Sequence, residues 1–299
     1  MFKSSALTDV YEPGSVQKVL TLSAVLDAGL GTPRQQYVVP PVLDRQDRPI
    51  HDHWVHGVEH LTLAGILAKS SNIGTVLAAD RFRPGQLRRY LTAFGLGRRT
   101  DVGPRGETKG LLPKGAAWTD QVDDRIAFGQ SLSVNAVQMV AAVNALANDG
   151  VRIDPSLVKG TATLDDGTPI GTDQVERRRV VSSEAAWQTA LMMERVLDPE
   201  DGVASIASVP GYRIAGKTGT AQRVAEECGC YDGSHTASFV GFGPTDDPRF
   251  TIYVVVHDSR TGGGSAVAGP AFAKLMSYSL RRYGVKRTET RPSQLPVEW

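Results

Sequence analysis

The segment YEPGSVQK at residues 11–18 places a serine one helical turn before a lysine, at the start of a predicted helix. A Pro-Gly pair breaks the backbone just before Ser15, and apolar residues then recur at near-helical spacing as far as Gly29. At a helix N-terminus the backbone N–H groups and the dipole favour developing negative charge. A lysine whose pKa is lowered can take the proton from a serine hydroxyl, so Ser15 and Lys18 are the candidate nucleophile and base of an acyl-transfer site.

Two further polar clusters have an order and a separation that suit the same site. SSN at residues 70–72 lies at a bend between two apolar helical patterns, residues 61–69 and 73–80, where short polar side chains can point into a cleft. KTG at residues 217–219 lies inside a predicted strand, and its glycines indicate the close approach of a ligand or of another backbone. We therefore expect the three clusters to form one active site.

Each cluster has weak specificity alone, because similar patterns recur in the chain. A second Ser-x-x-Lys pattern occurs at Ser156 and Lys159, in a stretch of alternating β-type residues where an offset of three puts the two side chains on opposite faces. A second Ser-x-Asn pattern begins at Ser133, which we interpret as the N-cap of a helix over residues 134–147. The predicted secondary structure therefore selects the earlier copy of each pattern.

The remaining patterns predict an α+β fold. Three strands separated by turn residues, 212–220, 236–242 and 250–257, favour an antiparallel meander. Further elements are expected as helices at residues 83–95, 182–196 and 270–283, a hairpin excursion at residues 151–181 and an extended tail at residues 291–299.

The composition of the 299 residues is that of a globular chain with a core, since 41% of them are hydrophobic. There are 33 basic and 32 acidic side chains, so the net charge of +1 provides no field for nucleic acid or for an anionic membrane. The longest aliphatic stretch, residues 252–256, is far shorter than the roughly 20 residues of a membrane-spanning helix, and the first residues lack the apolar core of a signal peptide. We expect neither an anchor nor an export signal in this chain.

Two cysteines, Cys228 and Cys230, are too few and too close for a zinc site without histidine ligands. They could form a local disulfide in an oxidising compartment, or they could remain two unpaired loop thiols. The sequence leaves both alternatives open.

A group of histidines is the strongest sign of a different chemistry. His56 and His60 could share a helix face as i and i+4 and bind zinc, with His51 and His53 nearby. The other interpretation is a solvated loop that enters the helix predicted from residue 61. We favour the loop and expect no metal.

Together, the motifs and the residues around them resemble the transpeptidase domain of class B penicillin-binding proteins. The resemblance covers nearly the entire chain and rests on residues 11–18, 67–72, 129–133 and 214–222. Residues 246–250 and 292–299 resemble more narrowly the division-specific enzymes of actinobacteria. The resemblance implies the fold of penicillin-binding proteins and serine β-lactamases, in which helices flank an antiparallel sheet and a helical subdomain lies beside it.

The resemblance also implies a catalytic role for each polar residue. Ser15 would attack the penultimate D-Ala carbonyl of a peptidoglycan stem peptide, D-Ala would leave, and the acyl group would pass to an amine of a neighbouring stem. Lys18 would be the base for acylation, and Ser70 would relay a proton toward the leaving amine. Asn72 would hydrogen-bond the donor peptide and Lys18, and Lys217 would supply positive potential.

Substrate contacts and partners are implied in the same way. Thr218 and Thr220, on either side of Gly219, would bind the terminal carboxylate, and the backbone N–H groups of Ser15 and Thr220 would form an oxyanion hole. β-Lactams, which mimic D-Ala-D-Ala, would acylate Ser15 without a metal or other cofactor. In the family, the partners are a SEDS glycosyltransferase and other division proteins at the extracytoplasmic face of the cell membrane.

Two alternatives stay open. A serine hydrolase of the same fold, either a D,D-carboxypeptidase or a β-lactamase, would share the three motifs, although we find no glutamate motif after Asn72 of the kind that a β-lactamase requires. The other alternative is an inactive fragment or scaffold, because a membrane anchor, a pedestal domain, a helix and two strands precede the nucleophile in the family. We expect residues 1–299 to form a transpeptidase domain that lacks the first strands of its sheet, with the strand at residues 250–257 as an exposed edge.

Overall fold

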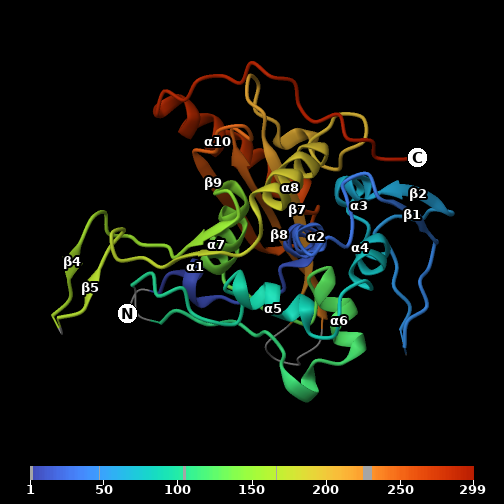
Figure 1. Cartoon of the computed structure of the whole chain (residues 1–299), viewed down its shortest axis with the longest axis horizontal. Helices are drawn as coiled ribbons and strands as arrows, with labels where there is room; N and C mark the ends of the chain where they lie inside the picture. Colours follow the sequence, from blue (N-terminus) through green and yellow to red (C-terminus); the bar gives the residue numbers. More distant parts are fainter. Residues whose placement is uncertain (1–2, 47, 104–105, 166, 225–230) are drawn as a thin grey trace.

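The computed structural model describes residues 3–46, 48–103, 106–165, 167–224 and 231–299. The chain forms an antiparallel sheet beside a group of helices (Figure 1). The sheet contains β7 (Ala215–Val224), β8 (Tyr231–Gly243) and β9 (Phe250–Ser259), which are hydrogen-bonded in that order. The predicted meander is therefore confirmed, and β9 is an edge of the sheet among the described strands, as expected.

Helices cover both faces of this sheet. On one face the ring of Phe239 in β8 packs on the ring of Phe272 in α10 (Gly269–Arg282), with 4.6 Å between the centroids. On the other face Phe242 lies beside α7 (Ala136–Ala147) and α8 (Ser183–Arg195). Positions 239 and 242 are an odd number of residues apart, so they point to opposite faces of the strand. This layered arrangement confirms the predicted α+β fold.

The helix that follows the candidate nucleophile lies at the centre of the helical region. A short 3-10 turn, η1 (Gly14–Val16), leads into α2 (Gln17–Asp27), and every residue of α2 except the last is buried. Helices on several sides, from α3 to α8, pack against α2. A helix that is buried around its whole circumference is held rigidly by its neighbours. The fold therefore gives the residues at the start of α2 a fixed position.

The other predicted helices also form, within a few residues of their expected bounds. Further helices among the described residues are α1 (Ser5–Thr8), α3 (Leu63–Lys69), α4 (Asn72–Ala79), α5 (Gln86–Ala93), α6 (Asp120–Ala127) and α9 (Gly264–Val267), with the 3-10 turns η2 (Gly115–Ala117) and η3 (Ser205–Ala207). Of the helices in the described ranges, none combines the length and the apolar character that a bilayer crossing requires.

The prediction that Ser133 caps α7 is wrong. The N-cap is Asn135, whose side chain accepts a hydrogen bond from the backbone N–H of Gln138 at 2.8 Å, while the Gln138 side chain accepts from the backbone N–H of Asn135 at 2.9 Å. This reciprocal capping box satisfies two N–H groups of the helix end. Ser133 is instead extended and exchanges two backbone hydrogen bonds of 2.9 Å with Leu111.

The predicted hairpin excursion is confirmed. β3 (Val151–Ile153) pairs with β6 (Arg177–Arg179), and between them β4 (Ala162–Thr163) pairs with β5 (Pro169–Ile170). Figure 1 shows β4 and β5 projecting from the body of the molecule. The second Ser-x-x-Lys pattern lies on this excursion, and the Ser156 hydroxyl accepts a hydrogen bond from the backbone N–H of Val158 at 3.2 Å. The second Ser-x-x-Lys pattern therefore lies on the excursion and not at the start of α2, and its serine caps a local turn.

The tail at residues 291–299 contains no helix and packs beside a small sheet. β1 (Gln36–Val39) pairs with β2 (Glu59–Thr62), and the tail lies along the other side of β2. The backbone N–H of Thr62 donates to the Val297 carbonyl at 3.0 Å, and the N–H of Trp299 donates to the His60 carbonyl at 3.2 Å. Because Thr62 is also the N-cap of α3, the tail fixes the helix that leads to the SSN cluster.

Candidate active site

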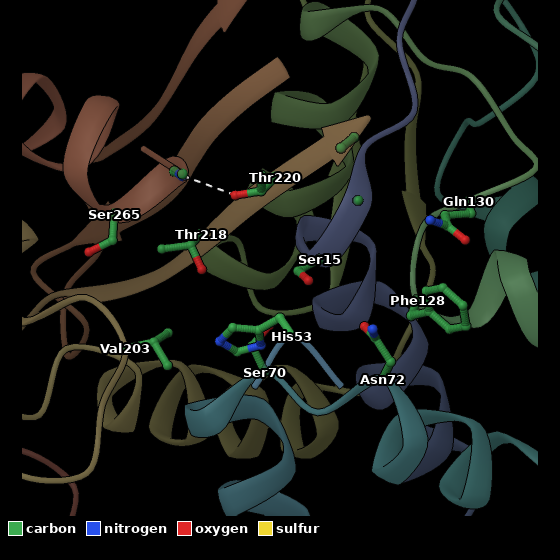
Figure 2. A pocket seen from close by; sticks show the side chains of 14 residues that line it. Ser15, His53, Ser70, Asn72, Phe128, Gln130, Val203, Thr218, Thr220 and Ser265 are labelled. Atoms are coloured by element: carbon green, nitrogen blue, oxygen red, sulfur yellow. Dashed lines mark hydrogen bonds between the residues drawn. The ribbon is translucent and has the colours of Figure 1, made fainter. Parts of the chain in front are cut away.

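The three polar clusters meet at one cavity of about 400 Å³ between β7 and the helical region. Figure 2 shows the side chains of Ser15, Ser70, Asn72, Thr218 and Thr220 around this cavity. These residues come from η1, the turn after α3, the first residue of α4 and β7. The expectation that the clusters lie together is confirmed for all five side chains.

Glycines allow the turn that carries Ser15 to contact its neighbours closely. Gly14 has a left-handed φ of +53°, and its N–H donates to the carbonyl of Gly129 at 3.0 Å. A Cβ on Gly129 would lie 1.9 Å from the Gly14 carbonyl oxygen, and a Cβ on Gly219 would lie 3.0 Å from the Pro13 carbonyl oxygen. The close approach predicted at the KTG cluster is thus an approach of β7 to the turn that carries Ser15.

The Ser70 hydroxyl lies between two lysines. Lys217 Nζ donates to Ser70 Oγ at 2.9 Å, and Lys18 Nζ lies 3.3 Å from the same oxygen and 2.5 Å from the Ser70 carbonyl oxygen. Ser70 occupies the C-cap of α3 with a left-handed φ of 63°, an uncommon conformation for a serine that turns its carbonyl and hydroxyl toward Lys18. One hydroxyl therefore connects the two amines.

Both amines are fully buried, and their surroundings disfavour positive charge. Burial lowers the pKa of Lys18 to about 7, although the Asp52 carboxylate opposes this shift. Burial also lowers the pKa of Lys217 well below its usual range, and the charge of Lys18 lowers it further. Because desolvation penalises each ammonium and the two charges repel, the pair holds less than two protons near neutral pH. A neutral lysine amine is thus available at the Ser70 hydroxyl.

Two contacts expected of Lys18, with Asn72 and with Ser15, do not occur among the hydrogen bonds of the described residues. The Asn72 side-chain amide donates to the His51 carbonyl at 2.8 Å, and no Asn72–Lys18 bond occurs among the hydrogen bonds of the described residues. Likewise, across the described ranges, Ser15 Oγ has no hydrogen bond to Lys18 Nζ. Lys18 is therefore oriented by Ser70.

The KTG strand presents its hydroxyls to the cavity. Thr218 Oγ1 accepts a hydrogen bond from Lys217 Nζ at 3.1 Å, and Thr220 Oγ1 accepts from the backbone N–H of Gly264 at 3.0 Å (Figure 2). A Cβ on Gly264 would lie 2.4 Å from the Gly219 carbonyl oxygen, so the start of α9 packs on the strand. This contact was not predicted, because it joins segments that are 44 residues apart.

Some of the residues that line the cavity were not predicted as site residues: His53, Phe128, Val203, Gly263, Gly264 and Ser265. The charges of Lys18 and Lys217 add to burial in lowering the pKa of His53, while Asp52 acts in the opposite direction. In the sequence His53 had significance only as a member of the histidine group. Its place at the cavity depends on the loop at residues 51–56 folding back, for which no local pattern exists.

The histidine group does not form the helix face on which a zinc site would depend. His56 Nε2 lies 3.2 Å from Asp52 Oδ2, whereas His60 is in β2 with its ring against that of Trp299. In the described part of the chain, no three His, Cys, Asp or Glu side chains form a group that could hold a metal ion. Cys228 and Cys230 lie outside the described residues, so the disulfide alternative stays a prediction.

Known proteins show the same sequence pattern and the same fold. The profile of the penicillin binding protein transpeptidase domain matches residues 1–277. The penicillin-binding protein PbpB of Mycolicibacterium smegmatis is 38% identical over 289 residues, which is 94% of this chain and 44% of the relative. PbpB of Mycobacterium tuberculosis is 36% identical over 289 residues, which is 94% of this chain and 42% of the relative. The chain therefore spans less than half the length of either PbpB protein.

Solved structures agree with this assignment. The crystal structure of penicillin-binding protein 3 from Mycobacterium tuberculosis in complex with aztreonam has a TM-score of 0.90 and 34% identity, and the match covers 100% of this chain and 68% of that one. The transpeptidase domain of penicillin-binding protein 3 from Burkholderia pseudomallei has a TM-score of 0.83 and 34% identity, with 98% and 84% covered. This chain belongs to the penicillin-binding protein transpeptidase domain family.

Proposed function

We propose that this chain is the catalytic domain of a peptidoglycan D,D-transpeptidase that forms an acyl-enzyme on Ser15. The observation that carries the proposal is the position of Ser70 Oγ, which contacts both buried lysines beside the cavity that contains Ser15. A lysine amine that is neutral near pH 7 can act as a base, and the Ser70 hydroxyl gives the proton a path onward.

In the proposed acylation step, one bond forms at Ser15 and one peptide bond of the substrate breaks. Ser15 Oγ forms a bond to the carbonyl carbon of the penultimate D-Ala while Lys18 Nζ takes the hydroxyl proton. The tetrahedral oxyanion is held by the backbone N–H groups of Ser15 and Thr220, and each such donor contributes about 2.7–4 kcal/mol in other serine enzymes. The C–N bond to the terminal D-Ala then breaks, and the proton passes through Ser70 to the leaving amine. In the second step an amine of a neighbouring stem attacks the acyl carbon, the bond from that carbon to Ser15 Oγ breaks, and the proton of the amine returns to Ser15 Oγ through Lys18.

The substrate-binding proposal rests on the free edge that β7 presents to the cavity. Thr218 and Thr220 side chains line that cavity, and their hydroxyls are suited to the terminal carboxylate of a stem peptide. An extended peptide can add to a strand edge through backbone hydrogen bonds. Lys217 Nζ donates to the Thr218 hydroxyl and, whenever it is protonated, supplies positive potential there. Asn72 would contact the donor peptide from the opposite side.

The names of relatives support a role in cell-wall synthesis. A relative from Pseudomonas aeruginosa, 32% identical over 288 residues, is named a probable peptidoglycan D,D-transpeptidase. We place this chain in peptidoglycan cross-linking at division, on the extracytoplasmic face of the membrane, with a SEDS glycosyltransferase and other division proteins as partners. In this proposal residues 1–299 belong to one transpeptidase domain, with residues 291–299 as its tail.

Labelling with a fluorescent penicillin tests the proposed function. We expect one covalent label per chain, resistant to denaturation and released slowly, because penicillin would form an ester on Ser15 and the proposed transpeptidase passes its acyl group to an amine rather than to water. The measurement is fluorescence of the denatured protein after gel separation, followed over time after removal of free penicillin. Rapid release with turnover of penicillin would instead indicate a β-lactamase, and absence of any label would contradict the proposal.

The rate of labelling should depend on pH. Below its pKa of about 7 Lys18 is protonated and cannot accept the proton of Ser15, so the rate should rise as pH increases through that value and then level off. The second-order rate constant of acylation, measured from about pH 5 to about pH 9, gives the midpoint. A rate that is constant over this range would exclude Lys18 as the base.

A further inference from the structure

A buried carboxylate lies directly behind the SSN cluster and does not line the cavity. The side chain of Asp52 has no exposed surface. Asp52 Oδ2 accepts a hydrogen bond from the Ser71 hydroxyl at 2.7 Å, and Asp52 Oδ1 accepts from the backbone N–H groups of Asn72 and Ile73, the latter at 3.1 Å. A carboxylate with this many donors is held in one orientation.

These contacts fix the turn that carries Ser70. Ser71 is the N-cap of α4, and its hydroxyl oxygen accepts from the N–H of Gly74 at 2.8 Å while its proton goes to Asp52. The first turn of α4 is therefore capped twice, by Ser71 and by Asp52. Ser70 precedes this capped turn and is held in the left-handed conformation that points its carbonyl and hydroxyl at Lys18.

The loop that carries Asp52 is also joined to the cluster by a second contact. The Asn72 side chain donates to the carbonyl of His51 at 2.8 Å, on the residue just before Asp52. On the other side of the carboxylate, His56 Nε2 lies 3.2 Å from Oδ2. The loop at residues 51–56 and the SSN cluster therefore form one hydrogen-bonded unit.

Asp52 also brings negative charge close to Lys18. Among the described residues, the titratable groups that interact with Lys18 are Asp52 and His53 from the loop and Lys217 from β7. Of these three, only Asp52 can carry negative charge, and it favours the protonated form of Lys18. The carboxylate thus acts on the geometry of Ser70 and on the protonation of Lys18.

We propose that Asp52 is a positioning residue of the acyl-transfer site, which fixes the Ser70-Ser71-Asn72 turn so that the Ser70 hydroxyl lies between Lys18 and Lys217. The expected change in acylation rate rests on the proposed function, whereas the hydrogen bonds of Asp52 in this chain do not depend on it. Asp52 does not touch the cavity, so it acts through Ser70 and Asn72.

The test compares Asp52→Asn with a matched control, Glu107→Gln. Asparagine keeps the shape and one acceptor oxygen for the two backbone N–H groups but lacks the charge and the acceptor for the Ser71 hydroxyl. Glu107 is also a buried carboxylate that accepts from two backbone N–H groups, of Thr100 at 2.6 Å and of Asp101 at 3.1 Å, and it does not line the cavity. Glu107→Gln therefore shows how much the acylation rate and its pH profile change when a buried carboxylate away from the cavity is neutralised.

Two readouts separate positioning from general damage. Asp52→Asn should lower the plateau rate of penicillin acylation by about tenfold or more, because small misplacements of catalytic groups have effects of this size. It should also move the midpoint of the pH profile to lower pH, by about half a unit or more, because Lys18 loses a favourable charge. Glu107→Gln should leave the midpoint of the pH profile unchanged. It should lower the plateau rate only in proportion to any loss of folded protein.

The midpoint can be measured without activity. NMR of protein labelled with ¹³Cε-lysine follows the titration of Lys18 directly, with the signal assigned by its loss in Lys18→Arg. A chain that takes no penicillin but shows the downward shift in Asp52→Asn would refute the proposed function and support the position of Asp52. An unmoved or raised midpoint would overturn the inference, and so would, in a chain that takes penicillin, a plateau rate equal to that of Glu107→Gln.

If Asp52→Asn fails to fold, Ser71→Ala provides the second test. This variant removes the two hydrogen bonds of the Ser71 hydroxyl, to Asp52 and from the backbone N–H of Gly74, and leaves the Asp52 charge in place. We expect a lower acylation rate with an unchanged midpoint, because the geometry of the turn is affected and the field at Lys18 is not. A rate equal to that of the unmodified chain would contradict the positioning role.

Discussion

Ser15→Ala should abolish covalent labelling by a fluorescent penicillin. The label requires a bond between the penicillin carbonyl carbon and Ser15 Oγ, and the hydroxyls of Ser70, Thr218 and Thr220 are held in hydrogen bonds with Lys217 and Gly264. None of those hydroxyls is at the start of a helix of eight or more residues, where N–H groups would stabilise the oxyanion. We therefore expect complete loss of label with little change in thermal stability, since alanine fits the half-exposed position.

The chain provides a matched control for this prediction. Ser156 begins the second Ser-x-x-Lys pattern, and its hydroxyl caps a local turn on the excursion between β3 and β6. Ser156→Ala should label at the unmodified rate. Gel fluorescence and intact mass of both variants give the result, and a label that persists in Ser15→Ala at one per chain would show that another residue is the nucleophile.

Lys18→Met should slow acylation strongly and leave the fold intact or more stable. Loss of a general base commonly reduces rates by about 10²–10⁴-fold. Methionine has a similar length but needs no hydration, so it removes the cost of burying an amine whose pKa has fallen to about 7. The substitution also relieves Lys217 of a neighbouring positive charge. We expect the melting temperature at neutral pH to be at least that of the unmodified chain.

The sign of the pH dependence makes this prediction specific. The pKa of Lys18 is about 7 in the folded chain and about 10.4 in an unfolded one, so the unfolded chain binds more protons between these values. Stability from this residue is therefore lost as pH falls from about 10 to about 7. Lys18→Met should flatten the melting temperature over this range, whereas Lys159→Met, at the exposed lysine of the second pattern, should not. A marked fall in melting temperature for Lys18→Met would contradict the argument.

Local patterns predicted the parts of the fold that local forces dominate. The buried helix after Ser15, the meander and the hairpin excursion follow from hydrophobic spacing and turn residues. Strand ends were less accurate, because β7 and β8 continue their pairing past the apolar run, through an irregularity after Gln222 to the pair Val224 and Tyr231. Ser133 was misassigned because its backbone partner, Leu111, is distant in sequence and because the capping box two residues later is stronger.

The sequence predicted the polar residues that line the site, but not the residues that hold them in position. Each of the three clusters lies at the cavity, because helix starts and turns place short polar side chains at the surface of the core. Asp52 and His53 had no comparable signal, since their relation to Ser70 depends on a loop that folds back over some 20 residues. The contact of Lys217 with Ser70 could be guessed only from the family resemblance.

Because two lysines contact Ser70, the active site forms only when distant parts of the chain have come together. Ser70 lies 52 residues from Lys18 and 147 residues from Lys217 along the chain. Contacts of such long range form late in folding, after local helices and turns. A collapsed or partly synthesised chain can therefore contain all of α2 and still lack the second amine at Ser70. Covalent labelling by penicillin would count only chains that have completed folding, so it can serve as an assay of refolding yield.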